Sequence, residues 1–186
     1  MSYRVAISGS AGTGKSTLAE KLADRLDLPY LEEGFRRRLD GGLDPHTLSP
    51  EQMRDLLLEL YAEAMAELDT AVQGYGGFVA DRCSIDFLAF WLHYGFANDE
   101  QMTEKLFGRS IDDISRYDHI TVLPWDAFGI ENDGRRSTNK WLQLKFQSLF
   151  EGLVNRLIPS EKIIWMPKGV TNIDDRISLI VNWLSK

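Results

Sequence analysis

Residues 9–16 constrain the fold more strongly than any other part of this sequence. They read Gly-Ser-Ala-Gly-Thr-Gly-Lys-Ser and match the pattern G-x-x-x-x-G-K-[ST]. A β-rich segment, residues 3–8, precedes the pattern, and Leu18, Leu22 and Leu26 follow it at helical spacing. A glycine-rich turn between a strand and a helix N-terminus lets backbone N–H groups converge on an anion. The context therefore predicts a phosphate-binding loop (P-loop) rather than a chance glycine-rich turn.

The residues of the predicted P-loop have separate tasks. Lys15 supplies a mobile positive charge at the β- and γ-phosphates, and the Ser16 hydroxyl can ligate Mg²⁺. The pattern thus predicts that a nucleoside triphosphate binds here. The residues expected to hold it are Gly9, Ser10, Ala11, Gly12, Thr13, Gly14, Lys15, Ser16 and Thr17.

Length and composition limit the class of protein. A chain of 186 residues with 44% hydrophobic and 26% charged residues suits one globular domain spanning 1–186. The net charge of -7 argues against a large nucleic-acid surface. The single cysteine, Cys83, has no internal partner for a disulfide, as is typical of a reducing cytoplasm. Because no apolar run reaches about 18 residues and no signal-peptide pattern is seen, we expect a soluble cytoplasmic protein that does not contact the membrane. Whether it forms a homodimer stays open.

Five short, mostly apolar segments alternate with helical patterns. The expected strands are 3–8, 28–31, 78–81, 117–123 and 163–166, and the expected helices are 15–26, 50–73, 85–94, 99–114, 138–157 and 173–184. Residues 36–45 carry three arginines and several turn-forming residues, which is typical of a mobile surface loop. The alternation predicts a three-layer α/β/α fold with a five-stranded parallel sheet.

Candidate site residues follow the predicted strands. Ligands of parallel sheets bind beyond the carboxyl ends of the strands, so we expect Gly9, Glu33, Asp81 and the segment after Leu123 to face one crevice. Asp81 is expected to hold Mg²⁺ and its waters or to act as the base, although Asp is also a favoured helix N-cap. Arg82 could pair with a substrate phosphate, with Asp81 or with Glu33.

Glu33 could accept a proton from a substrate hydroxyl, or hold that hydroxyl in line with the γ-phosphate. The alternative is a solvated pair of neighbouring glutamates. Among Arg36, Arg37 and Arg38 we expect one to face the site and the others to be solvated or paired with acids. Cys83 is interpreted as a packing residue, because nothing beside it obviously lowers the pKa of its thiol. The three histidines lack metal-ligand spacing, and His93 is interpreted as structural.

Residues 124–138 form a predicted lid loop. Arg135 and Arg136 follow Gly134, where such a loop can hinge. An arginine closing from a lid would stabilise the charge of a transferring phosphoryl group, and the closed lid would exclude water. The alternative is a turn that happens to be basic. Trp125 and Phe128, near the start of this loop, could stack on a base or ring.

Together these motifs resemble the small P-loop kinases of nucleosides and nucleotides. Within that group the chain is most similar to the AAA-type ATP-binding family that includes ribosylnicotinamide kinase domains. There a Glu-x-x-Arg follows the second strand, here Glu33 to Arg36, and an Asp-Arg-Ser follows the third, here Asp81-Arg82 with Cys83 in place of the serine. An Asp-Gly-x-Arg-Ser motif occupies the lid, here residues 133–137. The resemblance spans nearly the whole chain.

The resemblance implies a P-loop NTPase fold of the nucleoside/nucleotide kinase type, with ATP as donor and Mg²⁺ as cofactor. It also implies substrate-site roles for Glu33 and Arg36 and favours Arg136 over Arg135 as the lid arginine. Residues 36–44 match no single substrate. Deoxynucleosides, ribonucleosides, nucleotides and ribosylnicotinamide therefore all stay open as acceptors.

The leading hypothesis is an ATP-dependent phosphotransferase that acts on a small nucleoside-like acceptor or a nucleoside monophosphate. Its predicted catalytic residues are Lys15, Glu33, Asp81, Arg82 and Arg136, with Glu33, Arg36 and Arg82 at the substrate and Ser16 and Asp81 at the metal. A second hypothesis is a nucleotide-binding switch or regulatory ATPase. The segment 139–142 lacks the Asp of a guanine-binding Asn-Lys-x-Asp motif, which argues against a GTPase. A third, a polynucleotide 5′-kinase, conflicts with the acidic charge balance.

Overall fold

A computed structural model describes residues 2–128 and 139–185 of the chain. In these residues the strands are β1 (Arg4–Ser8), β2 (Tyr30–Leu31), β3 (Phe78–Asp81), β4 (His119–Val122) and β5 (Ile163–Trp165). They form one sheet in the order β2-β3-β1-β4-β5, and every neighbouring pair is parallel. The predicted α/β fold with a five-stranded parallel sheet is confirmed.

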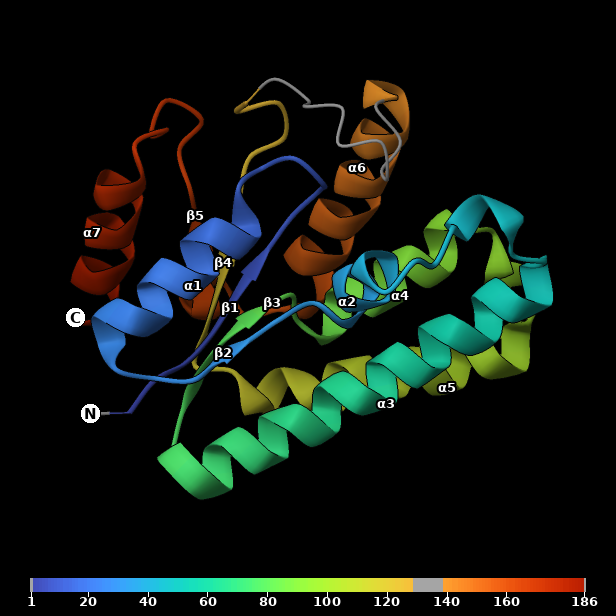
Figure 1. Cartoon of the computed structure of the whole chain (residues 1–186), viewed down its shortest axis with the longest axis horizontal. Coiled ribbons are helices and arrows are strands. Elements are labelled where there is room, and N and C mark those ends of the chain that lie inside the picture. Colours follow the sequence, from blue (N-terminus) through green and yellow to red (C-terminus); the bar gives the residue numbers. More distant parts are fainter. Residues whose placement is uncertain (1, 129–138, 186) are drawn as a thin grey trace.

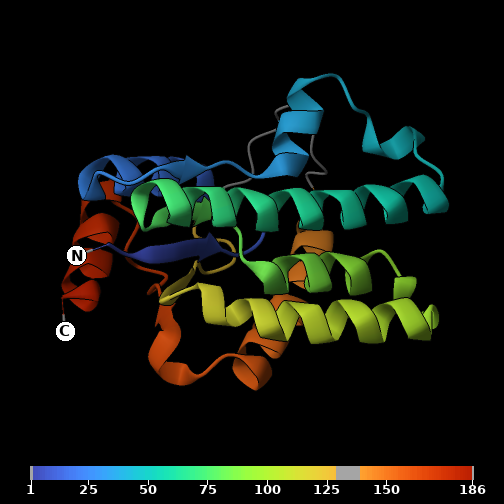
Figure 2. The same ribbon diagram turned by 90° about the horizontal axis from the view of Figure 1, so that it is seen from below.

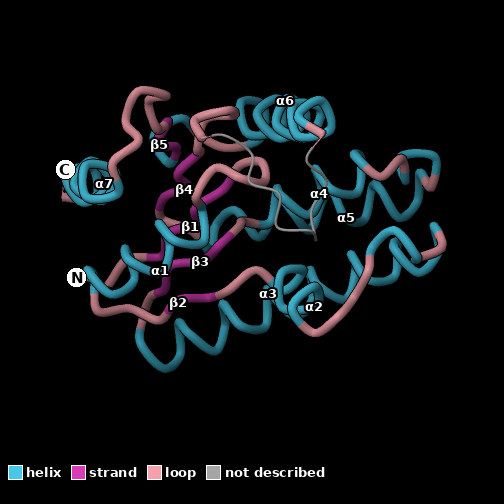
Figure 3. Tube along the Cα trace, turned by 45° about the horizontal axis from the view of Figure 1, so that its top comes forward, coloured by secondary structure: helices cyan, strands magenta, loops and turns pink. Residues whose placement is uncertain are grey.

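Helices cover both faces of the sheet (Figure 1). Val5 and Ile7 of β1 pack with α1 (Lys15–Leu26) and α7 (Ile173–Leu184). Ala6, between them, packs on the opposite face with α3 (Pro50–Tyr75), α4 (Ser84–His93) and α6 (Lys140–Leu157). Successive side chains of a strand point to opposite faces, so one apolar strand supplies both cores. Figure 3 shows the strands between these two groups of helices.

The long helix α3 begins at a complete capping box. The Ser49 hydroxyl accepts a hydrogen bond from the Gln52 backbone N–H, and the Gln52 side chain accepts one from the Ser49 N–H. Pro50 occupies the first turn, and Gly76, with φ of 76°, ends the helix. Helices α3, α4 and α5 (Glu100–Asp112) extend well past the strands in Figure 2. They project on the side of the carboxyl ends of the strands, where the site lies.

Residues 34–47 differ from the prediction of a mobile surface loop. They form α2 (Gly34–Asp40) and a short 3-10 helix, η1 (Pro45–Thr47). A seven-residue helix is too short to be stable alone, so tertiary contacts must hold it. Leu39 is buried and Phe35 packs against the core. Arg37 and Arg38 add partly exposed ion pairs of 2.6–2.8 Å with α3, to Glu67, Glu59 and Glu63. Sequence periodicity did not reveal this helix because its stability comes from α3.

Other element boundaries differ by a few residues from the expected ranges. The expected helix 99–114 is α5 followed by a 3-10 turn, Asp113–Arg116. Helix α3 continues to Tyr75 rather than 73, and β2 is limited to two residues. Within residues 2–128 and 139–185, no helix has both the length and the apolar content needed to cross a bilayer.

Candidate active site

The loop between β1 and α1 has the geometry of an anion-binding turn. Gly14, with φ of 80°, immediately precedes α1, and Gly9 adopts φ of 138°. A side chain at Gly9 would approach the Leu123 carbonyl oxygen to 3.0 Å, so the close contact with the end of β4 requires glycine. The Thr13 hydroxyl donates to the Ser10 carbonyl at 3.0 Å. The loop is therefore internally ordered, as the P-loop prediction requires.

Gln147 of α6 holds the start of this loop and was not predicted. Its Oε1 accepts a 2.7 Å hydrogen bond from the Ser10 N–H, and its Nε2 donates to the Leu123 carbonyl at 3.0 Å. The side chain is buried among apolar residues of α6. A polar residue on the apolar face of a predicted helix was the signal that could have identified it.

Lys15 lies buried beneath the loop. Its side-chain amine donates to the Ser10 carbonyl at 2.8 Å, and 5% of the residue is exposed. Burial, assisted by the nearby Arg82, lowers its pKa to about 8, although Asp81 and Glu33 act in the opposite direction. A bound anion would stabilise the charged form of this amine.

Asp81 and Ser16 meet beneath the P-loop. The Ser16 hydroxyl donates to Asp81 Oδ2 at 2.6 Å, while the buried Oδ1 has no hydrogen-bond partner within the described structure. Burial raises the pKa of the Asp81 carboxyl, against the opposing effect of Lys15. The alternative role of Asp81 as a helix N-cap is wrong, because Cys83 caps α4.

The Ser16–Asp81 pair fits a magnesium ion. Mg²⁺ favours hard oxygen ligands, and at nucleotide sites it uses one or two protein groups together with phosphates and waters. The unpartnered Asp81 oxygen is available for such a contact. In the part of the chain that the structure describes, no cluster of three or more His, Cys, Asp or Glu residues provides a fuller protein cage.

Arg82 connects the P-loop with the second strand. Its guanidinium donates to Glu33 at 2.5 Å, to Asp86 at 2.8 Å and to the Gly9 carbonyl at 3.1 Å. Burial alone would lower the pKa of Arg82, but Glu33 and Asp86 outweigh it and raise the pKa. Arg82 also has a φ of 98°, unusual for a non-glycine residue. Such backbone strain persists only where the surroundings fix the conformation.

Asp86 is a second residue that sequence analysis missed. It is fully buried and accepts hydrogen bonds from the Ser8 hydroxyl at 2.7 Å and the Cys83 backbone N–H at 2.9 Å, besides Arg82. It is the acidic residue of the otherwise strongly apolar helix α4. An isolated carboxylate in such a helix, four residues after an arginine, was a signal for a buried ion pair.

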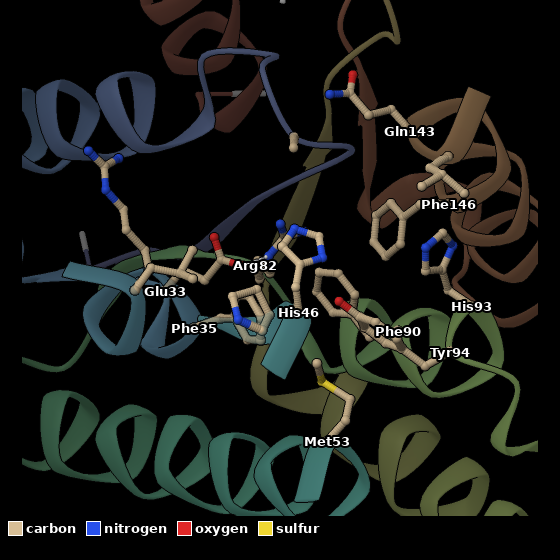
Figure 4. Close-up of a pocket in the computed structure, with 15 residues that line it drawn as sticks. Glu33, Phe35, His46, Met53, Arg82, Phe90, His93, Tyr94, Gln143 and Phe146 are labelled. Atoms are coloured by element: carbon tan, nitrogen blue, oxygen red, sulfur yellow. Dashed lines mark hydrogen bonds and ion pairs between the residues drawn. The ribbon is translucent and has the colours of Figure 1, made fainter. Parts of the chain in front are cut away.

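A cavity of about 340 Å³ opens beside Glu33 and Arg82. Figure 4 shows aromatic and apolar side chains surrounding it, from α2, α3, α4 and α6. Its lining comprises Ala11, Glu33, Phe35, Arg36, Leu39, Pro45, His46, Met53, Arg82, Phe90, His93, Tyr94, Leu142, Gln143 and Phe146. The cavity therefore touches the P-loop at Ala11 and the carboxylate at Glu33, and it lies in the crevice predicted from the strand ends.

Two rings in this cavity lie nearly parallel. Phe35 of α2 and Phe90 of α4 have ring centroids 6.5 Å apart and an interplanar angle of 18°. The Arg82 guanidinium lies 4.6 Å from the Phe90 ring centre. None of these aromatic residues was predicted to line a site, because α2 was not recognised and α4 was interpreted as packing.

The remaining predictions have mixed outcomes. Arg36 lines the cavity while Arg37 and Arg38 pair with acids of α3, as expected. Cys83 is buried, and burial raises the pKa of its thiol well above the usual value, which agrees with a packing role. His93, interpreted as structural, lines the cavity with His46. Arg135, Arg136 and most of the expected lid 124–138 lie outside the described residues.

Comparisons with known proteins agree with this geometry. A family model described as an AAA domain matches residues 4–169. A 60-residue stretch is 47% identical to a cytidylate kinase of Acidiphilium cryptum (strain JF-5), covering 28% of each chain.

Solved structures show the same fold at low identity. A NadR protein in complex with NR superposes on the whole chain with a TM-score of 0.75 and 23% identity, and the match covers 52% of the NadR chain. A deoxyadenosine kinase from M. mycoides has a TM-score of 0.70 and 14% identity over 98% of both chains. A thymidylate kinase from Candida albicans has a TM-score of 0.70 and 18% identity over 99% of this chain and 91% of that one.

The chain thus spans about half the length of the NadR protein that it matches and 28% of the cytidylate kinase. The fold is that of P-loop nucleoside and nucleotide kinases. Because the matching family model covers most of the sequence, the chain belongs to the AAA domain family that this model describes.

Proposed function

We propose that this protein transfers a phosphoryl group from ATP to a hydroxyl of a small acceptor that carries a flat aromatic ring, a nucleoside or a closely related molecule. The observation that carries the proposal is the position of Glu33. Its carboxylate lines the aromatic cavity and is fixed by Arg82, which also bonds the P-loop at Gly9. One network of hydrogen bonds thus joins a donor-binding loop to an acceptor-sized cavity.

On the donor side, residues 9–17 would hold the triphosphate through backbone N–H groups and the Lys15 amine. Ser16 and Asp81 would hold Mg²⁺, which supplies electrostatic stabilisation of the transferring group when bound. Arg136 would add a further positive charge from the lid, as proposed from the sequence.

On the acceptor side, Glu33 would orient the attacking hydroxyl and accept its proton. The carboxylate already accepts from Arg82, which fixes its direction before a substrate binds. Asp81 is the weaker candidate for the base, because it bonds Ser16 and does not line the aromatic cavity. We therefore assign proton transfer to Glu33 and metal binding to Asp81.

The ring spacing supports a planar acceptor. Two van der Waals contacts, one on each face of a flat ring, need about 7 Å, given an optimum of about 3.5 Å for each carbon–carbon contact. The ring centroids of Phe35 and Phe90 are 6.5 Å apart and the rings are nearly parallel, so the two rings would have to separate slightly to hold a flat ring between them. A base or a nicotinamide-like ring stacked there would use the aromatic contact that nucleobases commonly make.

The charges around the cavity favour an uncharged nucleoside over a monophosphate. Arg82 is already neutralised by Glu33 and Asp86. Among the described lining residues, Arg36 is the arginine more loosely held, with Glu32 and Asp40 at 4.0 and 3.9 Å. A nucleoside monophosphate would have to bind mainly through Arg36, which is a single and partly exposed contact.

The relatives offer the same range of acceptors. Their names include cytidylate, deoxyadenosine and thymidylate kinases and a NadR protein with bound NR. We extend to this chain the reaction that these proteins have in common. Which nucleobase the acceptor carries is decided by experiment.

An acceptor panel tests the proposal. ADP release and phosphorylated product are measured with ATP and Mg²⁺, alone and with ribonucleosides, deoxynucleosides, ribosylnicotinamide and the corresponding monophosphates. We expect ADP release to rise strongly with at least one nucleoside and to vanish in Lys15→Ala, whose fold is checked by circular dichroism. ADP release that no acceptor changes would indicate a regulatory ATPase instead. Transfer to oligonucleotide ends would indicate a polynucleotide 5′-kinase.

A further inference from the structure

Arg176 is a buried cation that the proposed mechanism does not use. It lies near the start of α7, where 1% of the residue is exposed, among apolar side chains that pack against α1 and β1. No carboxylate of residues 2–128 or 139–185 forms an ion pair with it. Burial, without a compensating charge, lowers the pKa of this guanidinium. Arginine is rarely buried without an acidic partner.

The guanidinium lies directly behind the P-loop. Its Nη1 donates to the Thr13 carbonyl at 3.0 Å, and its Nε donates to the Val170 carbonyl at 2.7 Å. The Phe128 ring covers it, with its centre 4.7 Å away, and the same ring lies beside Gly14. The buried Nη2 has no hydrogen-bond partner in the described structure. One side chain therefore links the segment after β5, the P-loop and Phe128 of the expected lid segment.

The bond to Thr13 determines how the next peptide is oriented. In a trans peptide the C=O and the following N–H point in opposite directions. Because the Thr13 carbonyl points to Arg176, the Gly14 N–H points away from α7. P-loops bind phosphates through such N–H groups, so a fixed Thr13–Gly14 peptide keeps one of them ready for the donor.

The charge itself needs an explanation. Hydrogen bonds to two carbonyls offset part of the desolvation, but an apolar side chain of similar volume often stabilises a fold more than a buried ion does. A positive charge that no carboxylate of the described residues balances gains a counter-charge when phosphates bind in front of the loop.

We infer that Arg176 is a positioning residue for the donor triphosphate: it orients the Thr13–Gly14 peptide and contributes a buried positive charge that the phosphates balance. The inference rests on the donor half of the proposed function alone and is independent of the acceptor. It assigns α7 a part in donor binding although α7 lies outside the phosphate-binding motif.

Binding measured without an acceptor tests this inference. Arg176→Met, Arg176→Lys and the unmodified protein are compared by calorimetric titration with ATP·Mg²⁺ and with inorganic tripolyphosphate, which has no base. Melting temperatures are recorded with and without ligand. Arg25→Met, an exposed arginine of α1, is the matched control.

We expect Arg176→Met to weaken the binding of both ligands by about tenfold or more, as expected for a lost hydrogen bond to a charged group. The melting temperature of the unliganded variant is recorded separately, because removing a buried charge and leaving two carbonyls without their donor act on stability in opposite directions. Arg176→Lys should bind both ligands with an affinity between those of Arg176→Met and the unmodified protein. Arg25→Met should bind them with the affinity of the unmodified protein. In transfer assays, KM for ATP should rise while KM for the acceptor is unchanged.

Unchanged binding of tripolyphosphate by Arg176→Met would overturn the inference, as would a lower melting temperature combined with unchanged binding. If Arg176→Met does not fold, Arg176→Lys decides: weaker tripolyphosphate binding supports the inference, and normal binding overturns it. Normal binding of ATP without transfer to any acceptor would refute the proposed function and leave this inference standing.

Discussion

Glu33 and Arg82 are 49 residues apart in the chain, yet the Arg82 Nε donates to the Glu33 carboxylate at 2.5 Å. Both follow parallel strands that are neighbours in the sheet, so their side chains emerge at the same edge. The same guanidinium bonds the Gly9 carbonyl of the P-loop. A change at Glu33 therefore acts through two hydrogen bonds on the P-loop.

Glu33→Gln should reduce kcat by about 10²- to 10⁴-fold, because the amide keeps the shape but does not accept the proton of the acceptor hydroxyl. The kcat of Glu33→Gln is measured from steady-state phosphoryl transfer to the best acceptor. Glu32→Gln is the matched control, since Glu32 does not line the aromatic cavity, and it should keep kcat within about threefold, as surface changes usually have small effects. Equal losses in both variants would contradict the role of Glu33.

Asp81→Asn should raise the Mg²⁺ concentration needed for half-maximal transfer by about 10- to 100-fold, because it replaces a metal-binding carboxylate. Its fold should persist, since burial already raises the pKa of Asp81 and favours the neutral form. Magnesium titrations and melting curves check the two expectations. Asp24→Asn, an exposed acid of α1, should behave as the unmodified protein. An unaltered magnesium requirement in Asp81→Asn would remove Asp81 from the metal site.

The affinity of the free protein for ATP should fall as pH rises above about 8. Burial lowers the pKa of Lys15 to about 8, so the amine is charged below this value and loses its charge above it. The phosphates of ATP keep their charge over this range, because their last pKa is near about 6. ATP titrations from pH 7 to 9.5 measure the effect. Lys15→Met should bind weakly at every pH, and a pH dependence that survives in this variant would assign it to another group.

Phe35→Ala should raise KM for a nucleoside acceptor by about 10- to 100-fold, the range expected when one aromatic stacking contact of about 1–3 kcal/mol is lost. KM for ATP should change much less, because Phe35 lies on α2 and is not one of residues 9–17, which are expected to hold the triphosphate. Phe107→Ala, an exposed phenylalanine of α5, is the control. An unchanged acceptor KM in Phe35→Ala would show that the ring stacks elsewhere.

Gly77→Ala should destabilise the fold by about 2 kcal/mol or more, since an added Cβ would come within 2.3 Å of the Tyr3 carbonyl oxygen, which is backbone. Gly74→Ala, three residues earlier in α3, meets no atom within 4 Å and should stabilise the helix by about 0.5–1 kcal/mol. Denaturant unfolding of both variants measures the difference. Equal stability of the two would contradict the close packing of residues 3 and 77.

Some of the site was predictable from sequence because its signals are local. The P-loop pattern sets the backbone of residues 9–16 through its glycines and the following helix start. Glu33 and Asp81 could be placed at one edge because parallel strands bring their carboxyl ends together. The pairing of Ser16 with Asp81 follows from these two facts.

Long-range packing decided the rest. Helix α2 is held by the packing of Phe35 and Leu39 and by ion pairs of Arg37 and Arg38 with α3, and no periodicity within 34–40 records those partners. The aromatic cavity forms where α2, α3, α4 and α6 meet, so its rings looked like ordinary core residues in the sequence. Asp86 is the one carboxylate of the largely apolar α4, whereas Arg176 is one of several polar residues of α7. The atoms that the two side chains contact were decided only when those helices packed against the sheet. The sequence by itself determined the P-loop and the edge of the sheet that it occupies, because those signals are local. The tertiary structure decided what surrounds the loop, because buried charges and cavities depend on segments far apart in the chain.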